Sequence, residues 1–587
     1  MQDLRKIFRY ARPYRRDLFA AVGLIFIECI FEMVIPVLMS TLVDDGVPTH
    51  NMAVIFRQGG LMILCAVLAL ITGLLYARYA ARFANGFAAE LRMAEYAAVQ
   101  KFDFANLDRF SDASLVTRMT TDVTNIQNAY QMMLRMSVRA PASMIVALIM
   151  SYTINRRLAN IYLIAVILLG CALAFIMSRA TKYFGEAFRK YDDLNESVQE
   201  NVSAIRVVKA YVREKFEGEK FRKASENVRN LLMRAELILA WNAPLMQLTV
   251  YSCILLISWI GAQLIVSSGA TTFTTGDLMS MLSYCMNILM SLMMLSTVFV
   301  MITMSAASAK RVAEVLDEQS DLTNGEDPVM EVRDGSVKFD HVSFAYKKDG
   351  EKALEDIDLD IKSGETIGII GGTGSAKSSL VQLLPRLYDV TEGSVTIGGV
   401  DVRRYDLDTL RNNVAMVLQK NELFSGTIAE NLRWGNPDAT DAEIEDACKQ
   451  ACADEFIERF PDKYQTHIEQ GGNNVSGGQK QRLCIARALL KKPRILILDD
   501  STSAVDTATD AKIRHSFAEK IPGTTVFIIA QRISSVENAD KVLVLDNGRV
   551  SGFDTPANLL KTNAIYQDVY NSQTKGSGDF DEKGGEA

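Results

Sequence analysis

The residues best suited to chemistry lie in the run TIGIIGGTGSAKSSLVQLL at residues 366–384. An apolar strand leads into a glycine-rich turn, and an amphipathic helix follows. The glycines allow backbone N–H groups to curl around phosphate oxygens, and the N-terminus of the helix favours an anion. Lys377 can reach the outer phosphates of a nucleotide, and Ser378 offers its hydroxyl to magnesium. The run predicts an ATP-binding loop made of Gly371, Gly372, Thr373, Gly374, Ser375, Ala376, Lys377, Ser378 and Ser379.

One residue of this loop departs from the common phosphate-loop pattern, which has glycine before the lysine. Here that position is Ala376. An alanine side chain disfavours a positive φ, so we expect a negative φ at this position. The loop should then be slightly altered.

Two aspartates end a second apolar strand, in the run RILILDDSTSAVD at residues 494–506. Asp499 is placed to hold magnesium through water, and Asp500 stands where the hydrolytic water should be polarised. A strand end followed by a helix cap would also suit DDSTS and occurs in many α/β domains. The phosphate loop upstream favours the catalytic interpretation.

The elements that position these residues include a large membrane part. The chain has 587 residues, of which 49% are hydrophobic and 23% charged, so the apolar residues must be concentrated somewhere. About 20 consecutive apolar residues are needed to cross a bilayer. Stretches of that kind lie at about residues 18–43, 54–76, 137–154, 158–178, 244–266 and 278–304. Six spans leave both ends of the chain on the same side.

The orientation follows from the basic residues. The run LRKIFRYARPYRR precedes the first span and predicts an amphipathic elbow on the cytoplasmic face, within residues 1–17. The segments 77–135 and 179–242 are rich in Lys and Arg and have helical periodicity, so we expect the membrane helices to continue into the cytoplasm. Short inner helices near residues 110–119 and 195–204 should couple these extensions to the soluble domain, with Leu115, Val198 and Val202 as candidate contacts.

The predicted fold is an α-helical six-span membrane domain fused to an α/β phosphate-loop domain. Expected boundaries are 18–308 for the membrane domain, 309–331 for a linker, 332–570 for the soluble domain and 571–587 for a disordered tail. The net charge of -7 and the lack of a basic stripe give no reason to expect a nucleic-acid partner. The eight cysteines form no CxxC or Cys/His cluster, so no zinc or redox site is expected.

The run NVSGGQKQRLCIARALL at residues 474–490 lies between the phosphate loop and the second strand. With this order of motifs, the chain resembles the ATP-binding cassette (ABC) family, and six spans with one cassette resemble a half-size ABC exporter. The resemblance implies ATP and Mg²⁺ as cofactors and a second half-transporter as partner. In the family, two cassettes enclose two ATP molecules head to tail, and each site joins one chain's phosphate loop to the other chain's signature.

The resemblance also assigns roles to single residues. Tyr346 matches the aromatic residue that stacks on adenine, Gln419 matches the residue that links magnesium to the membrane domain, and Asp506 matches an aspartate of the dimer contact. The metal would be held by Ser378, Gln419 and Asp499. The signature that contacts the partner's ATP matches Val475, Ser476, Gly477, Gly478 and Gln479, with Val475 in place of the usual leucine.

Two positions depart from the family together. Asp500 stands where a glutamate polarises the water, and Gln531 stands where a histidine contacts the γ-phosphate. Asp is one methylene shorter than Glu, and Gln cannot carry charge or move a proton. Both changes weaken hydrolysis and spare binding, so the chain resembles the degenerate-site subunit of heterodimeric bacterial ABC exporters. Neutral drift in a homodimer is the alternative.

The transported molecule is less constrained. Glu28 and Glu32 are four residues apart and share one helix face at membrane depth, where they could line a substrate cavity, attract cations or pair with an arginine. The methionine-rich sixth span could adapt to varied apolar shapes or simply face lipid.

Together with these residues, the resemblance to half-size ABC exporters implies ATP-driven export of amphipathic small molecules or lipids across the bacterial plasma membrane, with the cassette in the cytoplasm. A homodimeric exporter with slow ATPase and a regulatory ATP-binding membrane protein that transports nothing are the alternatives. Stimulation of the ATPase by drug-like compounds in liposomes would argue against the regulatory protein.

Overall fold

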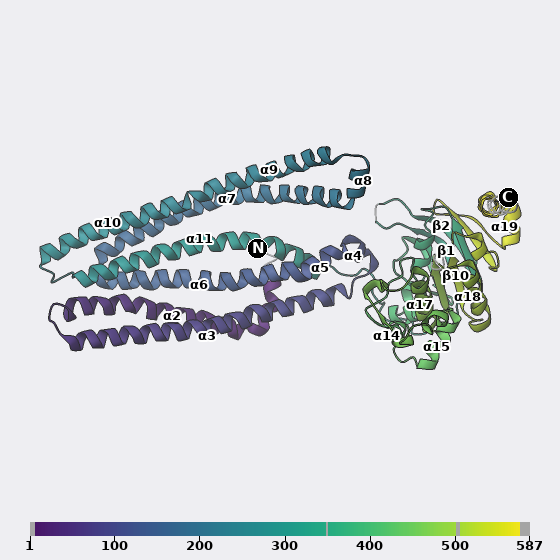
Figure 1. The fold of residues 1–587 in the computed structure, drawn as a ribbon, viewed down its shortest axis with the longest axis horizontal. Coiled ribbons are helices and arrows are strands. Elements are labelled where there is room, and N and C mark those ends of the chain that lie inside the picture. Colours follow the sequence, from purple (N-terminus) through teal and green to yellow (C-terminus); the bar gives the residue numbers. More distant parts are fainter. Residues whose placement is uncertain (1–5, 348–349, 501–504, 576–587) are drawn as a thin grey trace, which may run out of the picture. The chain divides into compact units, whose positions relative to one another are not determined.

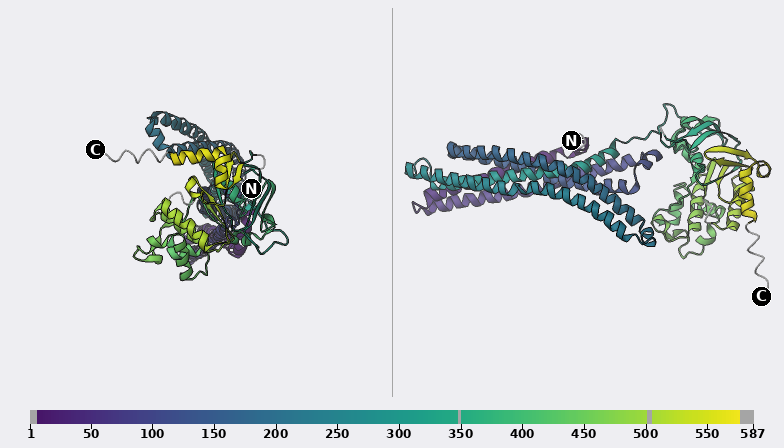
Figure 2. Two further views of the ribbon diagram at one scale, coloured as in Figure 1. Left: turned by 90° about the vertical axis from the view of Figure 1, so that its right-hand side faces the viewer. Right: turned by 90° about the horizontal axis from the view of Figure 1, so that it is seen from above.

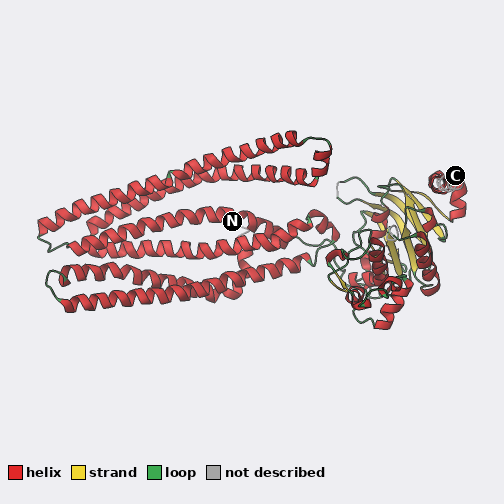
Figure 3. Cartoon of the chain, in the orientation of Figure 1, coloured by secondary structure: helices red, strands yellow, loops and turns green. Residues whose placement is uncertain are grey.

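The computed structural model describes residues 6–347, 350–500 and 505–575. Its internal contacts divide the chain into two units. The helical unit comprises Met1–Lys101 and Phe110–Glu318, and the α/β unit comprises Phe102–Arg109 and Gln319–Ala587. Figure 3 shows long helices in the first unit and strands flanked by helices in the second.

Long helices dominate the helical unit. They are α2 (Arg15–Thr41), α3 (Met52–Val99), α6 (Val123–Ile154), α7 (Arg156–Ser203), α9 (Glu214–Ala240), α10 (Asn242–Ser268) and α11 (Thr275–Asp317). The short elements are η1 (Phe8–Tyr14), η2 (Leu42–Gly46), α5 (Asp112–Thr117), η3 (Arg118–Asp122) and α8 (Ile205–Ala210). Within the described residues, 6 helical stretches are long and apolar enough to cross a membrane, which confirms the predicted six-span fold class.

Several of these helices are longer than a bilayer requires. The helices α3 and α7 have 48 residues each, and a helix rises about 1.5 Å per residue, so each is about twice as long as the hydrocarbon core is thick. The helix α2 packs along α3, α6 along α11 and α7 along α9, as Figures 1 and 2 show. The predicted continuation of the apolar spans into longer helices is therefore present.

A separate hydrophobic cluster holds the extended part of these helices together. Phe83, Phe87 and Leu91 of α3 are buried there against Val123 of α6. The element η1, at the predicted amphipathic elbow, packs its buried Ala11 into the same cluster, together with Ile7 just before it. The N-terminal segment thus belongs to the core of the helical unit.

The acidic pair of the first span has a partner. The Arg139 guanidinium of α6 donates hydrogen bonds to Glu28 Oε1 at 2.8 Å and to Glu32 Oε1 at 2.7 Å. Glu28 is 9% exposed, so its charge requires compensation. The structure therefore shows the arginine pairing that the sequence left open. This pairing accounts for both carboxylates without a cationic substrate.

The α/β unit contains two larger sheets. Its strands are β1 (Val337–Phe344), β2 (Leu354–Ile361), β3 (Thr366–Gly371), β4 (Glu392–Ile397), β5 (Val400–Asp401), β6 (Val414–Val417), β7 (Gly426–Thr427), β8 (His467–Ile468), β9 (Ile495–Asp499), β10 (Thr525–Ile529), β11 (Lys541–Asp546) and β12 (Arg549–Asp554). Its α-helices are α4 (Phe104–Arg109), α12 (Lys377–Gln382), α13 (Leu407–Asn413), α14 (Ile428–Arg433), α15 (Asp441–Gln450), α16 (Asp454–Ile457), α17 (Gly477–Leu489), α18 (Thr507–Lys520), α19 (Pro556–Thr562) and α20 (Ala564–Lys575).

The larger sheet positions the site. Its order is β12-β11-β3-β10-β9-β6, and all neighbours except β11 and β12 run parallel. Every residue of β9 and β10 is buried, as expected for central parallel strands covered on both faces. The carboxyl ends of β3, β9 and β10 therefore meet at one edge, where ligands of open α/β sheets bind. A second, antiparallel sheet has the order β2-β1-β4-β5.

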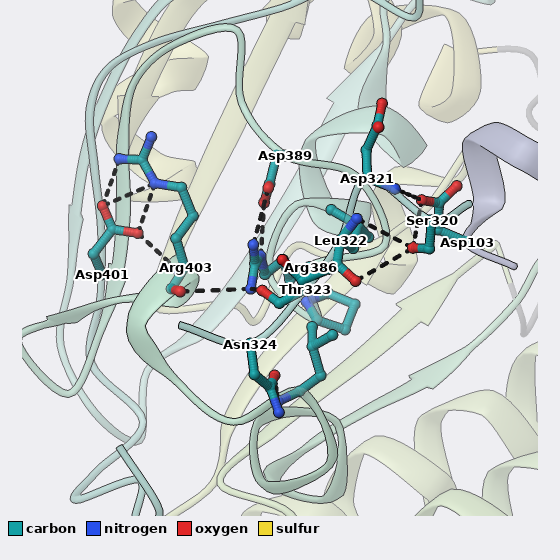
Figure 4. Close-up of polar contacts among 12 residues, drawn as sticks. Asp103, Ser320, Asp321, Leu322, Thr323, Asn324, Arg386, Asp389, Asp401 and Arg403 are labelled. Carbon is teal, nitrogen blue, oxygen red and sulfur yellow. Dashed lines mark hydrogen bonds and ion pairs between the residues drawn. The ribbon is translucent and has the colours of Figure 1, made fainter. Parts of the chain in front are cut away.

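The short helix α4, which lies between α3 and α6 in the chain, belongs to the α/β unit. Asp103, just before α4, accepts hydrogen bonds from Ser320 Oγ at 2.7 Å and from Asp321 N at 3.0 Å, as Figure 4 shows. Tyr388 donates its hydroxyl to Asp108 Oδ2 at 2.6 Å. In the same close-up, Arg386 pairs with Asp389.

These contacts correct the first predicted coupling segment. A short helix, α5, does form within residues 110–119, but Leu115 is buried inside the helical unit and is only 6% exposed. The contacts with the α/β unit come from the preceding segment, Phe102–Arg109. An apolar residue on a short amphipathic helix identifies a buried face, and it does not say which unit buries it.

The second predicted segment is also displaced. Residues 195–203 continue the long helix α7, because no breaker interrupts their helical periodicity. The short helix comes afterwards, at α8. Val198 and Val202 are exposed, and α8 and the turn after it expose Val207 and Tyr211. The exposed apolar residues therefore continue past residue 204, where the predicted segment ends.

The Arg139 pairing yields a stability prediction. Replacing Arg139 by Leu would leave two carboxylates unpaired on one helix face, and breaking such a pair costs about 3 kcal/mol when it is buried. We expect Arg139→Leu to lower the thermal unfolding midpoint of the purified protein clearly. Adding Glu28→Gln and Glu32→Gln should recover most of the loss.

Arg135 provides the control, because it lies one turn earlier on α6 and is exposed. Arg135→Leu should change the midpoint little. Equal effects of the two arginine substitutions, or no recovery in the triple variant, would contradict a structural role for the pairing.

Candidate ATP-binding site

The phosphate loop lies between the end of β3 and the start of α12. A Cβ atom at Gly371 would collide with the carbonyl oxygen of Leu545 and with Ser375 Oγ, so only glycine fits. Gly374 has a φ of +85°, which also favours glycine. Lys377 Nζ donates to the carbonyl oxygens of Gly371 at 2.9 Å and Gly372 at 2.8 Å. The loop thus curves around its own lysine.

The conformation of Ala376 differs from the expectation. Its φ is +65° and its ψ is +29°, in the left-handed region, so the expected negative φ is wrong. The turn from the loop into α12 requires this conformation, and the alanine adopts it at a cost of about 1–2 kcal/mol. The loop keeps its shape, and the backbone strain resides at this residue.

Oxygen donors gather next to the loop. Ser378 Oγ donates to Asp499 Oδ1 at 2.9 Å, so two of the predicted magnesium ligands are already in contact. Gln419, which follows β6, lines the same cavity, whose volume is about 460 Å³. Hydroxyl, carboxylate and amide oxygens are the donors that magnesium accepts. The donor set therefore fits a magnesium ion carried by a nucleotide.

The two unusual positions contact each other. Gln531 Nε2 donates a hydrogen bond to Asp500 Oδ2 at 2.9 Å. Asp500 has a φ of +48°, a conformation that Asp tolerates better than most residues. Asp500 follows the end of β9, and Gln531 follows the end of the neighbouring strand β10. Adjacent parallel strands thus bring the two residues together across 31 positions of sequence.

Burial and neighbouring charges shift the acidities in this cavity. Burial raises the pKa of Asp499, while the hydrogen bond from Ser378 lowers it. Burial also raises the pKa of Asp500, against the hydrogen bond from Gln531 and the charge of Lys377. Burial lowers the pKa of Lys377, and the two aspartates oppose that shift. Lys377 thus favours the charged form of both aspartates, whereas the neighbouring charge of Asp500 raises the pKa of Asp499 further.

The predicted adenine-stacking residue lies beside the loop. Tyr346 is 50% exposed, and its hydroxyl is 2.7 Å from Ser379 Oγ. Its ring contacts Phe344 and Tyr388, with ring centroids 4.8 Å and 5.3 Å away. Tyr346 is therefore half exposed, and an aromatic cluster holds its ring.

Comparisons with known proteins agree with this arrangement. The family model of the ABC transporter transmembrane region matches residues 18–293, and that of the ABC transporter cassette matches residues 354–503. An uncharacterized ABC transporter ATP-binding protein of Bacillus subtilis, YfiB, is 35% identical over 572 residues, which cover 97% of this chain and 98% of the relative. The chain belongs to the ABC transporter family.

Other relatives show the same extent of similarity. The uncharacterized ABC transporter ATP-binding protein Rv1273c of Mycobacterium tuberculosis is 34% identical over 578 residues, covering 96% of this ABC transporter chain and 97% of the relative. A solved structure of a bacterial Atm1-family ABC exporter with ATP bound has a TM-score of 0.80 and 24% identity, covering 95% of this chain and 99% of that one. The fold is therefore that of a half-size ABC exporter.

The signature of this ABC transporter lies outside the cavity. Ser476 caps the N-terminus of α17: its hydroxyl accepts from Gln479 N at 3.3 Å, and Gln479 Oε1 accepts from Ser476 N at 2.9 Å. Ser476 and Gly477 are exposed, and Val475 packs on the hydrophobic core. Asp506 caps α18 by accepting from Thr509 N at 2.9 Å. The cavity thus joins the loop, Gln419, Asp499, Asp500 and Gln531, and it does not include the signature or Asp506.

Sequence reasoning missed one element of the site. Val569 of α20 lines the cavity, and α20 continues through residues 571–575, where we expected the disordered tail to begin. The rest of that tail, residues 576–587, lies outside the described part of the chain. The polar sequence of residues 571–575 has little apolar periodicity. Only the apolar residues just before it could have indicated that the helix continues.

The strained alanine yields a prediction for this ABC transporter. Ala376→Gly removes the left-handed strain of about 1–2 kcal/mol and adds a chain-entropy cost of about 0.5–1 kcal/mol. We therefore expect a net stabilisation of up to about 1.5 kcal/mol, measured as a higher unfolding midpoint, with equal or tighter ATP binding.

Ala353 is a matched control. It is partly buried against the same hydrophobic cluster of the α/β unit as Ala376, but it has no positive φ. Ala353→Gly should lower the midpoint. If both substitutions lower it equally, the backbone at Ala376 stores no strain.

Proposed function

We propose that the chain is the subunit with the hydrolysis-impaired ATP site in a heterodimeric ABC exporter. The observation that carries this proposal is the hydrogen bond from Gln531 to Asp500. A catalytic carboxylate must face the attacking water and accept its proton. Here the carboxylate is short and accepts a hydrogen bond from the residue that should face the γ-phosphate.

The proposed site binds ATP with Mg²⁺. Loop amides and Lys377 would hold the phosphates, Ser378, Gln419 and Asp499 would hold the metal, and Tyr346 would stack on adenine. Magnesium would neutralise phosphate charge and orient the γ-phosphate. These residues are all of the expected types, so binding is spared. Apart from Ala376, whose backbone keeps the left-handed turn, the altered residues are those that would activate the water.

We propose that a second half-transporter completes both sites. The exposed N-terminus of α17 presents the amides of Gly477 and Gly478 next to the Ser476 hydroxyl, as a phosphate of the partner's ATP would require. This signature is intact. The chain would therefore present an intact signature to the partner's ATP, whereas its own ATP would meet altered catalytic residues. Asp506 would lie at the contact between cassettes.

The proposed substrate is an amphipathic small molecule or a lipid. A cavity of about 520 Å³ lies between α7 and α11, and its lining is apolar except for two hydroxyl groups. The lining residues are Gly170, Leu173, Ala174, Met177, Ser178, Thr181, Leu292 and Leu295. The probable multidrug resistance protein YheI of Bacillus subtilis is 34% identical over 430 residues, covering 73% of each chain. The relatives are bacterial, so we place the protein in a bacterial plasma membrane with the cassette in the cytoplasm.

A homodimeric exporter with a slow ATPase is the second candidate. It would use the same surfaces, and it requires that Asp500 and Gln531 suffice for turnover. The two candidates differ in whether mutations at the cavity and at the signature have equal effects.

The proposal predicts that mutations in the signature and mutations in the cavity have unequal effects. Ser476→Arg or Gly477→Asp should reduce ATP turnover of the purified pair on the order of a hundredfold, the scale for losing one transition-state donor. Asp500→Asn should reduce it by less than about twofold, because this carboxylate would not activate the water. Lys377→Ala should weaken ATP binding and slow the cycle without stopping it.

Steady-state ATPase activity in proteoliposomes measures all four variants, and equal reconstitution is checked by protein content. Near-complete loss of activity in Asp500→Asn alone would refute the impaired-site proposal. Equal losses from the signature and Asp500 substitutions would favour the homodimer.

A further inference from the structure

The C-terminal helix α20 contacts the segment that carries Gln531. Gln573 Nε2 donates to the carbonyl oxygen of Gln531 at 2.8 Å, and Gln573 Oε1 accepts from Ile533 N at 2.8 Å. One side-chain amide thus bonds two backbone groups on either side of Arg532. We propose that Gln573 is a positioning residue of the ATP site, which holds the Gln531 segment in register with the γ-phosphate position.

The residues on either side of this segment are held by the core, because Ala530 and Ile533 are buried and Ala530 N donates to the carbonyl oxygen of Ile369 at 3.3 Å. Strand β10 ends at Ile529, and the short helix η7 (Ile533–Ser535) begins only after Arg532. Gln531 therefore lies in the interval where the sheet hydrogen bonds have stopped and the helical ones have not begun. A side chain that bonds both ends of this interval fixes where the Gln531 side chain can point. It points to Asp500 at 2.9 Å.

The helix that presents Gln573 is itself firmly anchored. Tyr566 is 2% exposed, and Val569 and Tyr570 pack on the large hydrophobic core of the α/β unit. Asn563 precedes α20, accepts from Tyr566 N at 2.9 Å and donates to the carbonyl oxygen of Ser551 at 3.1 Å. Because α20 is fixed to the core, Gln573 can transmit that fixed position to the Gln531 segment.

The same helix also reaches the cavity. Val569 lines it, one turn before Gln573 on the same helix. Helix α20 therefore contributes two features to one site. Val569 is an apolar lining residue, and the Gln573 amide is a polar clamp that bonds the backbone around Gln531. The clamp acts on the residue that we propose contacts the γ-phosphate, whereas the loop around Lys377 would contact a nucleotide whether or not the γ-phosphate position is filled. Loss of the clamp should then affect a bound nucleotide only when the γ-phosphate position is filled.

This inference rests on the proposed role of Gln531 towards the γ-phosphate, and the test separates the two. The probe is a fluorescent ADP analogue carrying a methylanthraniloyl group, released from the purified full-length transporter with or without beryllium fluoride. Beryllium fluoride occupies the γ-phosphate position. The release phase that Lys377→Ala removes identifies this chain's own site.

Gln573→Ala should speed release of the beryllium fluoride complex about three- to tenfold, the scale of one net hydrogen bond, and leave release of the ADP analogue unchanged. Gln531→Ala is the benchmark and should do the same. Gln567→Ala is the matched control on the same helix, because its amide bonds the carbonyl of Leu560 and not the Gln531 segment. It should change neither rate. Gln573→Glu keeps the acceptor for Ile533 N and loses the donor, so it should lie between the wild type and Gln573→Ala.

Gln573 is exposed, so its substitution leaves the core intact. Unchanged release of the beryllium fluoride complex in Gln573→Ala, with faster release in Gln531→Ala, would overturn the positioning role alone. Equal acceleration with and without beryllium fluoride would also overturn it, because that result indicates general loosening of the domain. No effect of Gln531→Ala would remove the proposed role of Gln531 and this inference together.

Discussion

The account of this ABC transporter depends on one hydrogen bond, between the Gln531 amide and the Asp500 carboxylate. Both residues follow central strands of the parallel sheet, so their separation is set by the spacing of neighbouring strands. A longer acid and a basic ring at these positions would carry a charge and a transferable proton. Asp500 and Gln531 instead form a hydrogen bond with each other. An ATP site can then be complete for binding and deficient for water activation.

Backbone strain is concentrated around the same cavity. Ala376 and Asp500 both have positive φ, and both line the cavity that contains Lys377. Strained residues of this kind persist where the surrounding structure determines them and where function needs the resulting geometry. The hydrophobic core beneath β9 and β10 and the helix α20 provide that surrounding structure. Binding geometry is therefore maintained by packing, although two of its residues are not the usual ones.

Much of this site could be predicted from sequence. The glycine spacing before Lys377 and the apolar run before Asp499 identify a loop and a strand end by local chemistry alone, and both lie on the cavity. The six apolar spans were predictable because only length and hydropathy decide them. Contacts between distant segments were not predictable in the same way. Leu115 was expected to face the soluble domain and is buried in the helical unit, while Gln573 was expected in a disordered tail and reaches Gln531. Ala376 adopts a φ that propensity disfavours, because the loop geometry outweighs the local preference.

The central claim is that Asp500 and Gln531 limit hydrolysis at this chain's own site. It is tested most directly by a gain of function in the purified pair, with the partner's catalytic glutamate replaced by glutamine so that only this chain's site can turn over. The account predicts almost no ATP turnover with the wild-type chain, and clear turnover when this chain carries Asp500→Glu together with Gln531→His. Substantial turnover with the wild-type chain in that pair would contradict the account.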